Sequence, residues 1–402
     1  MRNLMEFHKI FFTNLTLLTL LSGCSCVSKM DHFHIESIQK TTHNQLKYVK
    51  NWHQTINNRK LYSDTKLRPV FFDNIIYSAN QNGIITALNT INGKEQWKIN
   101  LSESINVFSK KTPTFLSGGL TINDSYLYIG TEDATVFAIN LRDGSIAWKT
   151  TVMGEVLSYP EVSDNLVLVH TGNGILQALN QFNGVVQWSI NLDDNTPEFT
   201  LHGQSSPSAT SGIVIVGGDN GKVSAIMINQ GKLIWQQNIA KQKTIPKGIN
   251  KLSDVDVKPL VINGVVYAVA YNGNLAALDL QSGRVLWNRN IGSIHNMILN
   301  INHLFLVDQD DKLIAININN GTNIWQQNYL LNRHLTSPVW YRNNLVVGDA
   351  KGYLYWINPN NGQLVYAQKV DDAGFQTSPI VDKNNLFLIT QSKSGQVHMM
   401  MR

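Results

Sequence analysis

Short runs of apolar residues, separated by turns that contain glycine, make up most of this chain beyond about residue 70. Two examples are Leu166–Val169 and Val265–Val269, which are rich in β-branched side chains. Such runs are too short for helices, and Asn-Gly pairs between them are typical of tight hairpin turns. The pattern therefore predicts many short antiparallel strands.

These strands belong to a repeat, whose most regular copy is NGNLAALDLQSGRVLW, residues 272–287. A small residue is followed after four positions by alanine, after six more by glycine, and after four more by an aromatic residue. Ala134 and Asp311 replace the first glycine in two looser copies. Successive aromatic positions are 38 to 52 residues apart, which is typical of a propeller or array with one sheet per repeat.

Each repeat predicts four strands, and the aromatic residue on the fourth strand is expected to wedge between neighbouring sheets. The alanine on the third strand leaves room for it, and full burial of a tryptophan removes roughly 150–250 Å² of surface from water. The aromatic residues predicted to dock the blades in this way are Trp52, Trp97, Trp148, Trp188, Trp235, Trp287, Trp325 and Tyr366.

The last copy, residues 394–402, reaches its third strand and lacks the strand that would carry the aromatic residue. Residues 51–56, which contain Trp52, resemble that missing strand. We expect the two chain ends to pair, because an open array would leave sheet edges exposed to aggregation. The predicted fold is an all-β, eight-bladed β-propeller of four-stranded antiparallel blades, closed by the N- and C-terminal strands.

The N-terminus is predicted to be a processed signal rather than part of the fold. An apolar run from Ile10 to Leu21 is too short to span a bilayer and ends in Leu-Ser-Gly before Cys24. This pattern is typical of a bacterial lipoprotein signal, and the alternative is an ordinary signal peptide with an incidental cysteine. We predict removal of residues 1–23, lipidation at Cys24, a tether over 24–44 and a propeller over 45–402.

The composition argues against nucleic-acid binding and against a metal site, and it does not discriminate among the remaining functions. The net charge is +5, no block of lysine and arginine suggests nucleic-acid binding, and the two cysteines, Cys24 and Cys26, lie outside the propeller. His32 and His34 stand in the tether without further ligands, so no metal site is expected.

Unusually long connections between blades mark the candidate site, because long irregular loops in compact domains are usually functional. Two of them run from Trp188 to Pro207 and from Trp235 to Pro259. The first carries PEFTLHGQ with apolar residues in alternation, and the second carries KLSDVDV with two carboxylates two positions apart. Apolar anchors beside charges are typical of a protein contact. Alternatively, these side chains plug the ring and bond the loop backbone.

Taken together, the lipoprotein signal, the tryptophan repeats and the segments LHGQSSP, KLSDVDVKP, AYNGNLAALDLQSG and GYLYWIN resemble the BamB family. These are propeller lipoproteins of the outer-membrane β-barrel assembly machinery, with PQQ-like repeats. The resemblance implies an outer-membrane, periplasm-facing scaffold without catalysis that binds the periplasmic domains of BamA and assists unfolded outer-membrane proteins. It implies a BamA contact through Phe199, Leu201, His202, Asp254 and Asp256. The family usually has arginine where His202 stands.

Two other readings remain open at this point. Quinoprotein dehydrogenases also have eight such blades, with PQQ and a metal on the axis, but the expected pair of adjacent cysteines is missing from the propeller. The chain is therefore expected to have no cofactor and no catalytic residues. A further reading is another periplasmic interaction lipoprotein. Replacing Asp254 and Asp256 with lysine is expected to abolish BamA capture without unfolding, and clients are expected to add as strands to blade edges.

Overall fold

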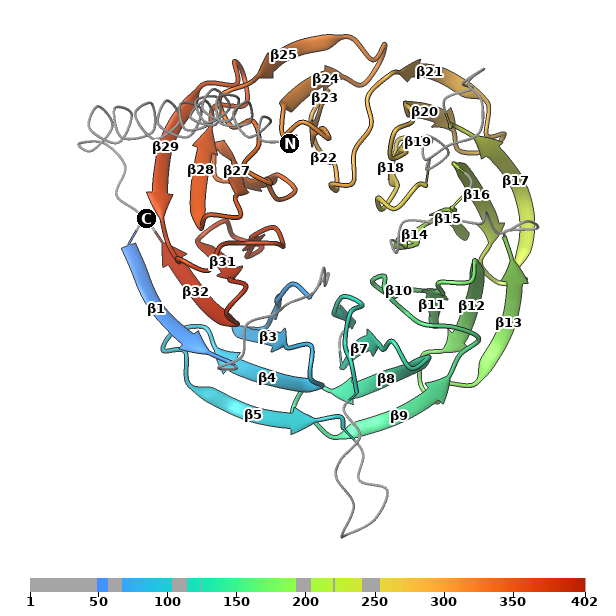
Figure 1. The fold of residues 1–402 in the computed structure, drawn as a ribbon. Helices are drawn as coiled ribbons and strands as arrows, with labels where there is room; N and C mark the ends of the chain where they lie inside the picture. The colour runs from blue at the N-terminus through green and yellow to red at the C-terminus, as the bar shows by residue number, and fades with distance from the viewer. Residues whose placement is uncertain are drawn as a thin grey trace, which may run out of the picture. The chain divides into compact units, whose positions relative to one another are not determined.

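The computed structural model describes residues 49–56, 67–102, 114–123, 125–192, 204–219, 221–240 and 254–401. The propeller unit is a ring of eight four-stranded antiparallel sheets, here called blades 1 to 8 (Figure 1). The described residues form strands and turns without an α-helix. Within them, no helix has the length and apolar character needed to span a bilayer. The predicted fold class is confirmed.

Blades 1 to 4 follow the chain order. Blade 1 consists of β2 (Val70–Phe72), β3 (Ile75–Ala79), β4 (Ile84–Asn89) and β5 (Glu95–Asn100). Blade 2 consists of β6 (Thr121–Asn123), β7 (Tyr126–Gly130), β8 (Thr135–Asn140) and β9 (Ile146–Thr151). Blade 3 consists of β10 (Glu161–Ser163), β11 (Leu166–His170), β12 (Ile175–Asn180) and β13 (Val186–Asn191). Blade 4 consists of β14 (Ser208–Thr210), β15 (Ile213–Gly217), β16 (Lys222–Met227) and β17 (Lys232–Asn238).

Blades 5 to 7 repeat this order, and blade 8 combines both ends of the chain. Blade 5 consists of β18 (Leu260–Ile262), β19 (Val265–Val269), β20 (Leu275–Asp279) and β21 (Val285–Arg289). Blade 6 consists of β22 (Ile298–Asn300), β23 (His303–Val307), β24 (Leu313–Asn317) and β25 (Asn323–Gln327). Blade 7 consists of β26 (Val339–Tyr341), β27 (Asn344–Gly348), β28 (Tyr353–Ile357) and β29 (Leu364–Lys369). Blade 8 consists of β30 (Ile380–Val381), β31 (Phe387–Gln391), β32 (Gln396–Met401) and β1 (Val49–Thr55).

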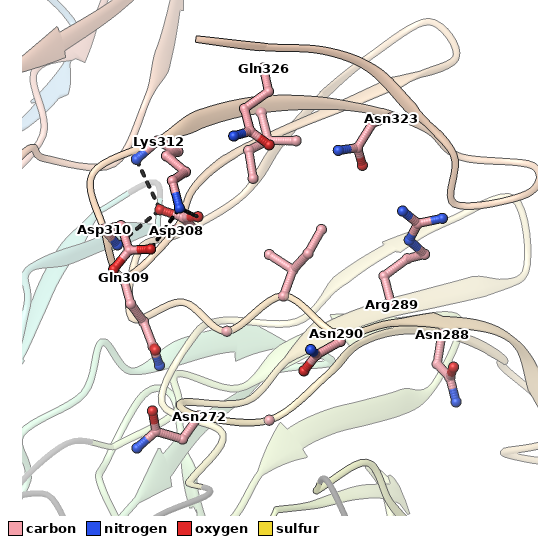
Figure 2. A pocket seen from close by; sticks show the side chains of 14 residues that line it. Asn272, Asn288, Arg289, Asn290, Asp308, Gln309, Asp310, Lys312, Asn323 and Gln326 are labelled. Atoms are coloured by element: carbon pink, nitrogen blue, oxygen red, sulfur yellow. Dashed lines mark hydrogen bonds and ion pairs between the residues drawn. The ribbon is translucent and has the colours of Figure 1, made fainter. Parts of the chain in front are cut away.

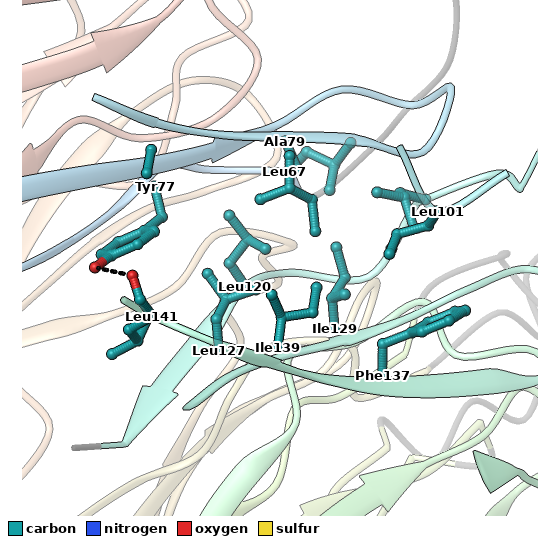
Figure 3. Packing of buried hydrophobic residues seen from close by; sticks show 13 residues of the cluster. Leu67, Tyr77, Ala79, Leu101, Leu120, Leu127, Ile129, Phe137, Ile139 and Leu141 are labelled. Carbon is teal, nitrogen blue, oxygen red and sulfur yellow. Dashed lines mark hydrogen bonds between the residues drawn. The ribbon is translucent and has the colours of Figure 1, made fainter. Parts of the chain in front are cut away.

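The core lies between the blades, because the two middle strands of each blade are buried and the outer strand is largely exposed. In blade 1, for example, β4 is buried along most of its length, whereas β5 has exposed residues at alternate positions. Figure 3 shows one such interface, where Tyr77 and Ala79 of blade 1 face Leu127 and Ile139 of blade 2. Since every blade buries both faces against neighbours, the ring needs no disulfide to hold it.

Seven tryptophans lock successive blades in the same way. Each indole lies against the turn glycine of the next blade, where an added Cβ would come within 2.5 to 2.7 Å of the ring or a neighbouring atom. Each indole Nε1 also donates a hydrogen bond of 2.7 to 2.9 Å to a backbone carbonyl oxygen three residues before that glycine. These contacts lie between neighbouring blades and are made by Trp52, Trp97, Trp148, Trp188, Trp235, Trp287 and Trp325.

Tyr366 stands at the eighth wedge position and pairs with Trp356, with ring centroids 5.2 Å apart. The blade that follows it is blade 8, in which no hairpin turn joins the third strand, β32, to the fourth, β1. Among the described residues, the hairpin that supplies the turn glycine and the acceptor carbonyl elsewhere is therefore missing at this interface. This explains why the one departure from tryptophan falls at this place.

The ring closes as expected, because β1 pairs antiparallel with β32. Trp52 lies opposite Met399, the position that alanine takes in the regular copies. The next pair is His53 and His398, whose rings stack with centroids 6.1 Å apart. His398 is fully buried, and its Nε2 lies 2.8 Å from the Asp371 carboxylate.

This closing pair predicts acid sensitivity. Burial lowers the pKa of His398 to about 4, and the positive charges of Lys50 and His53 act in the same direction against the opposing effect of Asp371. Between about pH 6.5 and pH 4 the unfolded chain binds a proton at this residue that the folded chain does not. The free energy of unfolding is therefore expected to be about 2 kcal/mol lower at pH 5 than at pH 7 from His398 alone.

Urea unfolding at the two pH values measures this difference. Burial also lowers the pKa of His295 to about 4, so its contribution falls in the same pH window and persists in a His398→Asn variant. That variant is expected to lose only the His398 share of the pH dependence. An unchanged difference between pH 7 and pH 5 in the variant contradicts the assignment.

Candidate partner-binding face

One face of the ring carries all the connections that run from the outer strand of one blade to the inner strand of the next, and we call it the connection face. The chain leaves each outer strand beside the turn between the second and third strands. The backbone N–H of Leu101, Leu192 and Ile239 donates to the carbonyl oxygen of the turn glycine in its own blade, at 2.8 to 3.0 Å. The connections after Trp97, Trp188 and Trp235, which are all unusually long in the sequence, therefore begin at the same face.

The segment with the predicted apolar anchors lies outside the described residues, including Phe199, Leu201 and His202. Its end is described, and there Gln204 is buried. Gln204 accepts a hydrogen bond from the N–H of Leu157 (2.8 Å) and donates one to the carbonyl oxygen of Glu155 (3.2 Å). The glutamine of LHGQSSP thus fastens this connection to the preceding one, a role that the sequence did not reveal.

The second connection becomes part of the core before it reaches blade 5. Asp254 is fully buried and Asp256 is half-buried. Val255 and Val257 pack into the hydrophobic clusters on either side of the blade, and Val255 fills the space over Gly217. The expectation that this stretch lies outside the blade core is therefore wrong, and with it the reason for expecting lysine at Asp254 to leave the fold intact.

Backbone hydrogen bonds hold this stretch in place. The Tyr271 N–H donates to the carbonyl oxygen of Asp254 (2.8 Å), and the Val255 N–H donates to that of Gly218 (3.1 Å). One partner belongs to blade 5 and the other to blade 4. The stretch therefore joins the two blades that flank it, and Asp256 is the more accessible of the two carboxylates.

Charged and aromatic side chains bridge the inner strands near the axis. The Lys258 ammonium and the Glu161 carboxylate form a 2.7 Å ion pair between blade 5 and blade 3. The Arg68 guanidinium lies 5.8 Å from the Tyr159 ring centroid and donates to Ser378 Oγ (3.0 Å). Burial raises the pKa of Tyr159, so the side chain beside the Arg68 guanidinium keeps its hydroxyl proton and stays neutral. These residues link non-adjacent blades and were not singled out in the sequence.

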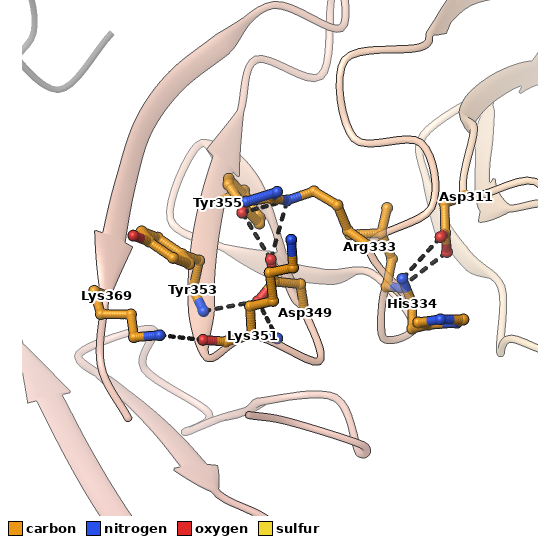
Figure 4. Close-up of polar contacts among 9 residues, drawn as sticks. Asp311, Arg333, His334, Asp349, Lys351, Tyr353, Tyr355 and Lys369 are labelled. Atoms are coloured by element: carbon orange, nitrogen blue, oxygen red, sulfur yellow. Dashed lines mark hydrogen bonds and ion pairs between the residues drawn. The ribbon is translucent and has the colours of Figure 1, made fainter. Parts of the chain in front are cut away.

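A buried polar cluster fixes the connection into blade 7 (Figure 4). Arg333 Nε donates to Asp349 Oδ2 (3.1 Å) and to the Tyr355 hydroxyl (2.8 Å), which itself donates to the same carboxylate oxygen (2.8 Å). Burial and the Asp349 charge raise the pKa of Tyr355, so it remains a donor. On the other side, the Asp311 carboxylate accepts from the N–H groups of His334 and Leu335. The cluster is satisfied internally and stabilises the loop.

The contacts of Asp311 explain why aspartate replaces glycine at this position of the repeat. It stands where most copies have glycine and adopts a positive φ of 64°. Its side chain, unlike glycine, supplies two hydrogen bonds of 2.8 and 2.9 Å to the next connection. The left-handed backbone, which costs about 1 kcal/mol for such a residue, is thereby offset. Within the described ranges, no group of three histidine, cysteine or acidic residues is placed to hold a metal ion.

Comparison with known proteins agrees with this architecture. The family model described as outer membrane protein assembly factor BamB matches residues 81–327. The outer membrane protein assembly factor BamB of Escherichia coli K12 is 46% identical over 351 residues, covering 87% of this chain and 88% of that protein. The protein of the same name from Yersinia pestis is 44% identical over 351 residues, with the same coverage.

Solved structures show the same fold at lower identity. The crystal structure of BamB from Moraxella catarrhalis has a TM-score of 0.76 and 23% identity, covering 89% of this chain and all of that one. Quinohemoprotein alcohol dehydrogenase from Comamonas testosteroni has a TM-score of 0.66 and 13% identity, covering 90% and 77%. The dehydrogenase likeness is one of fold alone and does not favour that function. The chain belongs to the BamB family of outer membrane protein assembly factors.

Proposed function

We propose that this assembly factor is a non-catalytic scaffold that binds the periplasmic domains of BamA through its connection face. The observation that carries the proposal is the pair of long connections on both sides of blade 4, which leave the ring at one face. The names of relatives at 44% and 46% identity support membership of the β-barrel assembly machinery and a location at the outer membrane.

The proposed contact uses the residues that the sequence singled out, with different roles. Phe199 and Leu201 supply apolar anchors, and His202 supplies a polar contact in the same connection. Asp256, which is half-buried, faces the partner as a charge that sets the docking register. Asp254 is fully buried and therefore acts by holding the segment rather than by touching BamA.

Anchoring is part of the same proposal. Residues 1–23 form a signal that is removed, Cys24 carries the lipid, and residues 24–44 tether the propeller on the periplasmic side of the outer membrane. Contacts near the axis support the proposal that the protein is not catalytic. There the Arg68–Tyr159 contact and the Lys258–Glu161 ion pair join the inner strands of several blades. Quinoproteins place their cofactor on this axis.

An Asp256→Lys variant tests the BamA contact. We expect it to fold normally and to bind the purified periplasmic domains of BamA at least tenfold more weakly, because reversing a charge at an interface introduces repulsion. Biolayer interferometry at low salt measures the affinity. Asp133→Lys is the matched control, since Asp133 is an exposed acid in the turn of blade 2 on the same face. Equal binding by the Asp256 variant and the parent rules out this contact.

Unfolded outer-membrane proteins are the proposed clients, bound as added strands. The outer strands of blades 4 and 5 are edges with exposed apolar side chains, Leu233 and Ile234 on β17 and Val285 and Leu286 on β21. An apolar free edge is a template for another strand. Backbone amides of β17 and β21 are expected to gain protection from hydrogen exchange when an unfolded client is added. Unchanged exchange at both strands contradicts this mode of binding.

A further inference from the structure

A groove of about 770 Å³ lies between the outer parts of blades 5 and 6, and we call it the blade 5–6 groove (Figure 2). One wall is the end of β21 and the residues after it, and the other is formed by β24, β25 and the turn before β24. Most lining side chains are amides or charged groups. The amides are Asn272, Asn288, Asn290, Gln309, Asn323 and Gln326.

The groove opens because the outer strand separates early in these two blades. In blades 1 to 4 the pairing of the third and fourth strands includes one further pair, such as Ile84 with Asn100. In blade 5 the pairing stops at Leu275 with Arg289. The Ile291 N–H then donates to the carbonyl oxygen of Arg289, whereas the corresponding N–H in blades 1 to 4 and 7 donates to a residue of the turn before the third strand. The chain therefore turns away and leaves a gap beside blade 6.

The groove presents polar groups that the described part of the chain does not satisfy. Asn288 and Asn323 have exposed side chains, and Arg289 is half-buried and reaches into the groove (Figure 2). None of the three has a side-chain hydrogen bond or ion pair with another described residue. Lys312, in contrast, is paired with Asp310 (2.6 Å) and Asp308 (3.9 Å). The cation available to a ligand is therefore Arg289.

Side-chain amides both donate and accept hydrogen bonds, and this combination suits the alternating N–H and C=O groups of a peptide backbone. The acidic pair Asp308 and Asp310 repels a multiply charged anion such as a phosphate more strongly than a single carboxylate. Aromatic residues, which commonly stack on sugar rings, are missing from the lining residues of this groove. The chemistry thus favours a polypeptide.

The dimensions suit an extended segment. The groove reaches from the turn at Asp308–Asp310 to Asn323, the first residue of the five-residue strand β25. At about 3.3 Å per residue, a strand of this length spans about 16 Å. A second, smaller groove of about 350 Å³ lies between blades 4 and 5 and shares Asn288 with the first. The lining of this second groove is half amide and half apolar.

We propose that the blade 5–6 groove binds an extended, polar polypeptide segment that presents an acidic side chain to Arg289. The amides hold the backbone of the segment, and the guanidinium selects the carboxylate through charge-assisted hydrogen bonds. The site uses none of the residues proposed to contact BamA, although Asn288 and Arg289 belong to β21, one of the two proposed client edges. Its test therefore needs only the isolated protein, and either proposal can fail without the other.

Fluorescence anisotropy with two labelled, terminally blocked dodecapeptides tests the site. Both consist of serine, threonine and asparagine, and they differ only in a central glutamate or glutamine. The glutamate peptide is expected to bind saturably and about tenfold more tightly than the glutamine peptide. Arg289→Gln is expected to remove this preference, and Asn323→Trp to abolish binding by filling the groove, with unchanged circular dichroism for both variants.

Arg284→Gln is the matched control, since Arg284 is an exposed arginine of the same blade outside the groove. It is expected to bind as the parent does. The proposal is overturned if the glutamate peptide does not saturate the parent, if Arg289→Gln keeps the preference, or if the sugar chitotetraose competes for the site. Loss of binding in Arg284→Gln also overturns it, because the effect is then not local to the groove.

Discussion

Replacing Trp148 with alanine is expected to lower the free energy of unfolding by about 3–5 kcal/mol, the usual cost of removing a buried tryptophan. Trp148 is the most buried of the seven wedge indoles at 8% exposure. The variant loses the packing on Gly184, the ring contact with Tyr128 at 5.9 Å and the hydrogen bond to the Gln181 carbonyl oxygen at 2.9 Å. Urea unfolding measures the loss.

A Trp148→Phe variant separates the ring from its N–H group. It keeps an aromatic side chain over the glycine and lacks the donor, so a loss of about 1 kcal/mol from the hydrogen bond is expected in addition to the smaller ring. The wedge assignment fails if Trp148→Ala costs less than about 1 kcal/mol. Such a result means that blades 2 and 3 pack equally well without the indole.

Replacing Asp254 with lysine is expected to unfold or strongly destabilise the protein. The side chain is fully buried between blades 4 and 5, and Val255 beside it already fills the space over Gly217. A longer, charged side chain at this place lacks both room and solvent, and costs of more than about 3 kcal/mol are typical of such changes. Soluble yield and the thermal midpoint measure the effect.

Lysine is expected to affect stability differently at Asp254 and at Asp256. Asp256→Lys is expected to keep the parent's thermal midpoint, because its side chain is half-buried. Loss of BamA binding in the Asp254 variant then reflects unfolding, whereas loss in the Asp256 variant reflects the contact. Equal thermal midpoints for the Asp254 variant and the parent would falsify the buried placement of Asp254.

The sequence predicted the fold well because its spacing is tied to packing. Six of the seven wedge tryptophans have an alanine opposite, and all seven lie against a glycine and donate to a carbonyl oxygen, so these features recur together. For Trp235 they are Ala225, Gly283 and the Leu280 carbonyl oxygen. Closure was predictable for the same reason. Trp52 has the neighbours of a fourth strand, and the last copy lacks one.

The connections were less predictable because they follow no repeat. Alternation of aspartate and valine in LSDVDV suggested two exposed carboxylates, but burial here depends on which residues of two blades lie above and below the segment. The groove was also missed. It arises from one lost strand pair at Arg289, and the sequence of blade 5 is otherwise the most regular copy.

The pairing of β1 with β32 has a consequence for biogenesis. His53 and His398 meet in one sheet although the whole propeller lies between them in the chain. Because the chain is made from its N-terminus, β1 has no partner strand until synthesis of β32 is almost complete. A chain truncated a few residues before β32 would leave β1 without its partner strand and blade 8 incomplete. We therefore expect proteolytic quality control to act most strongly on such late truncations.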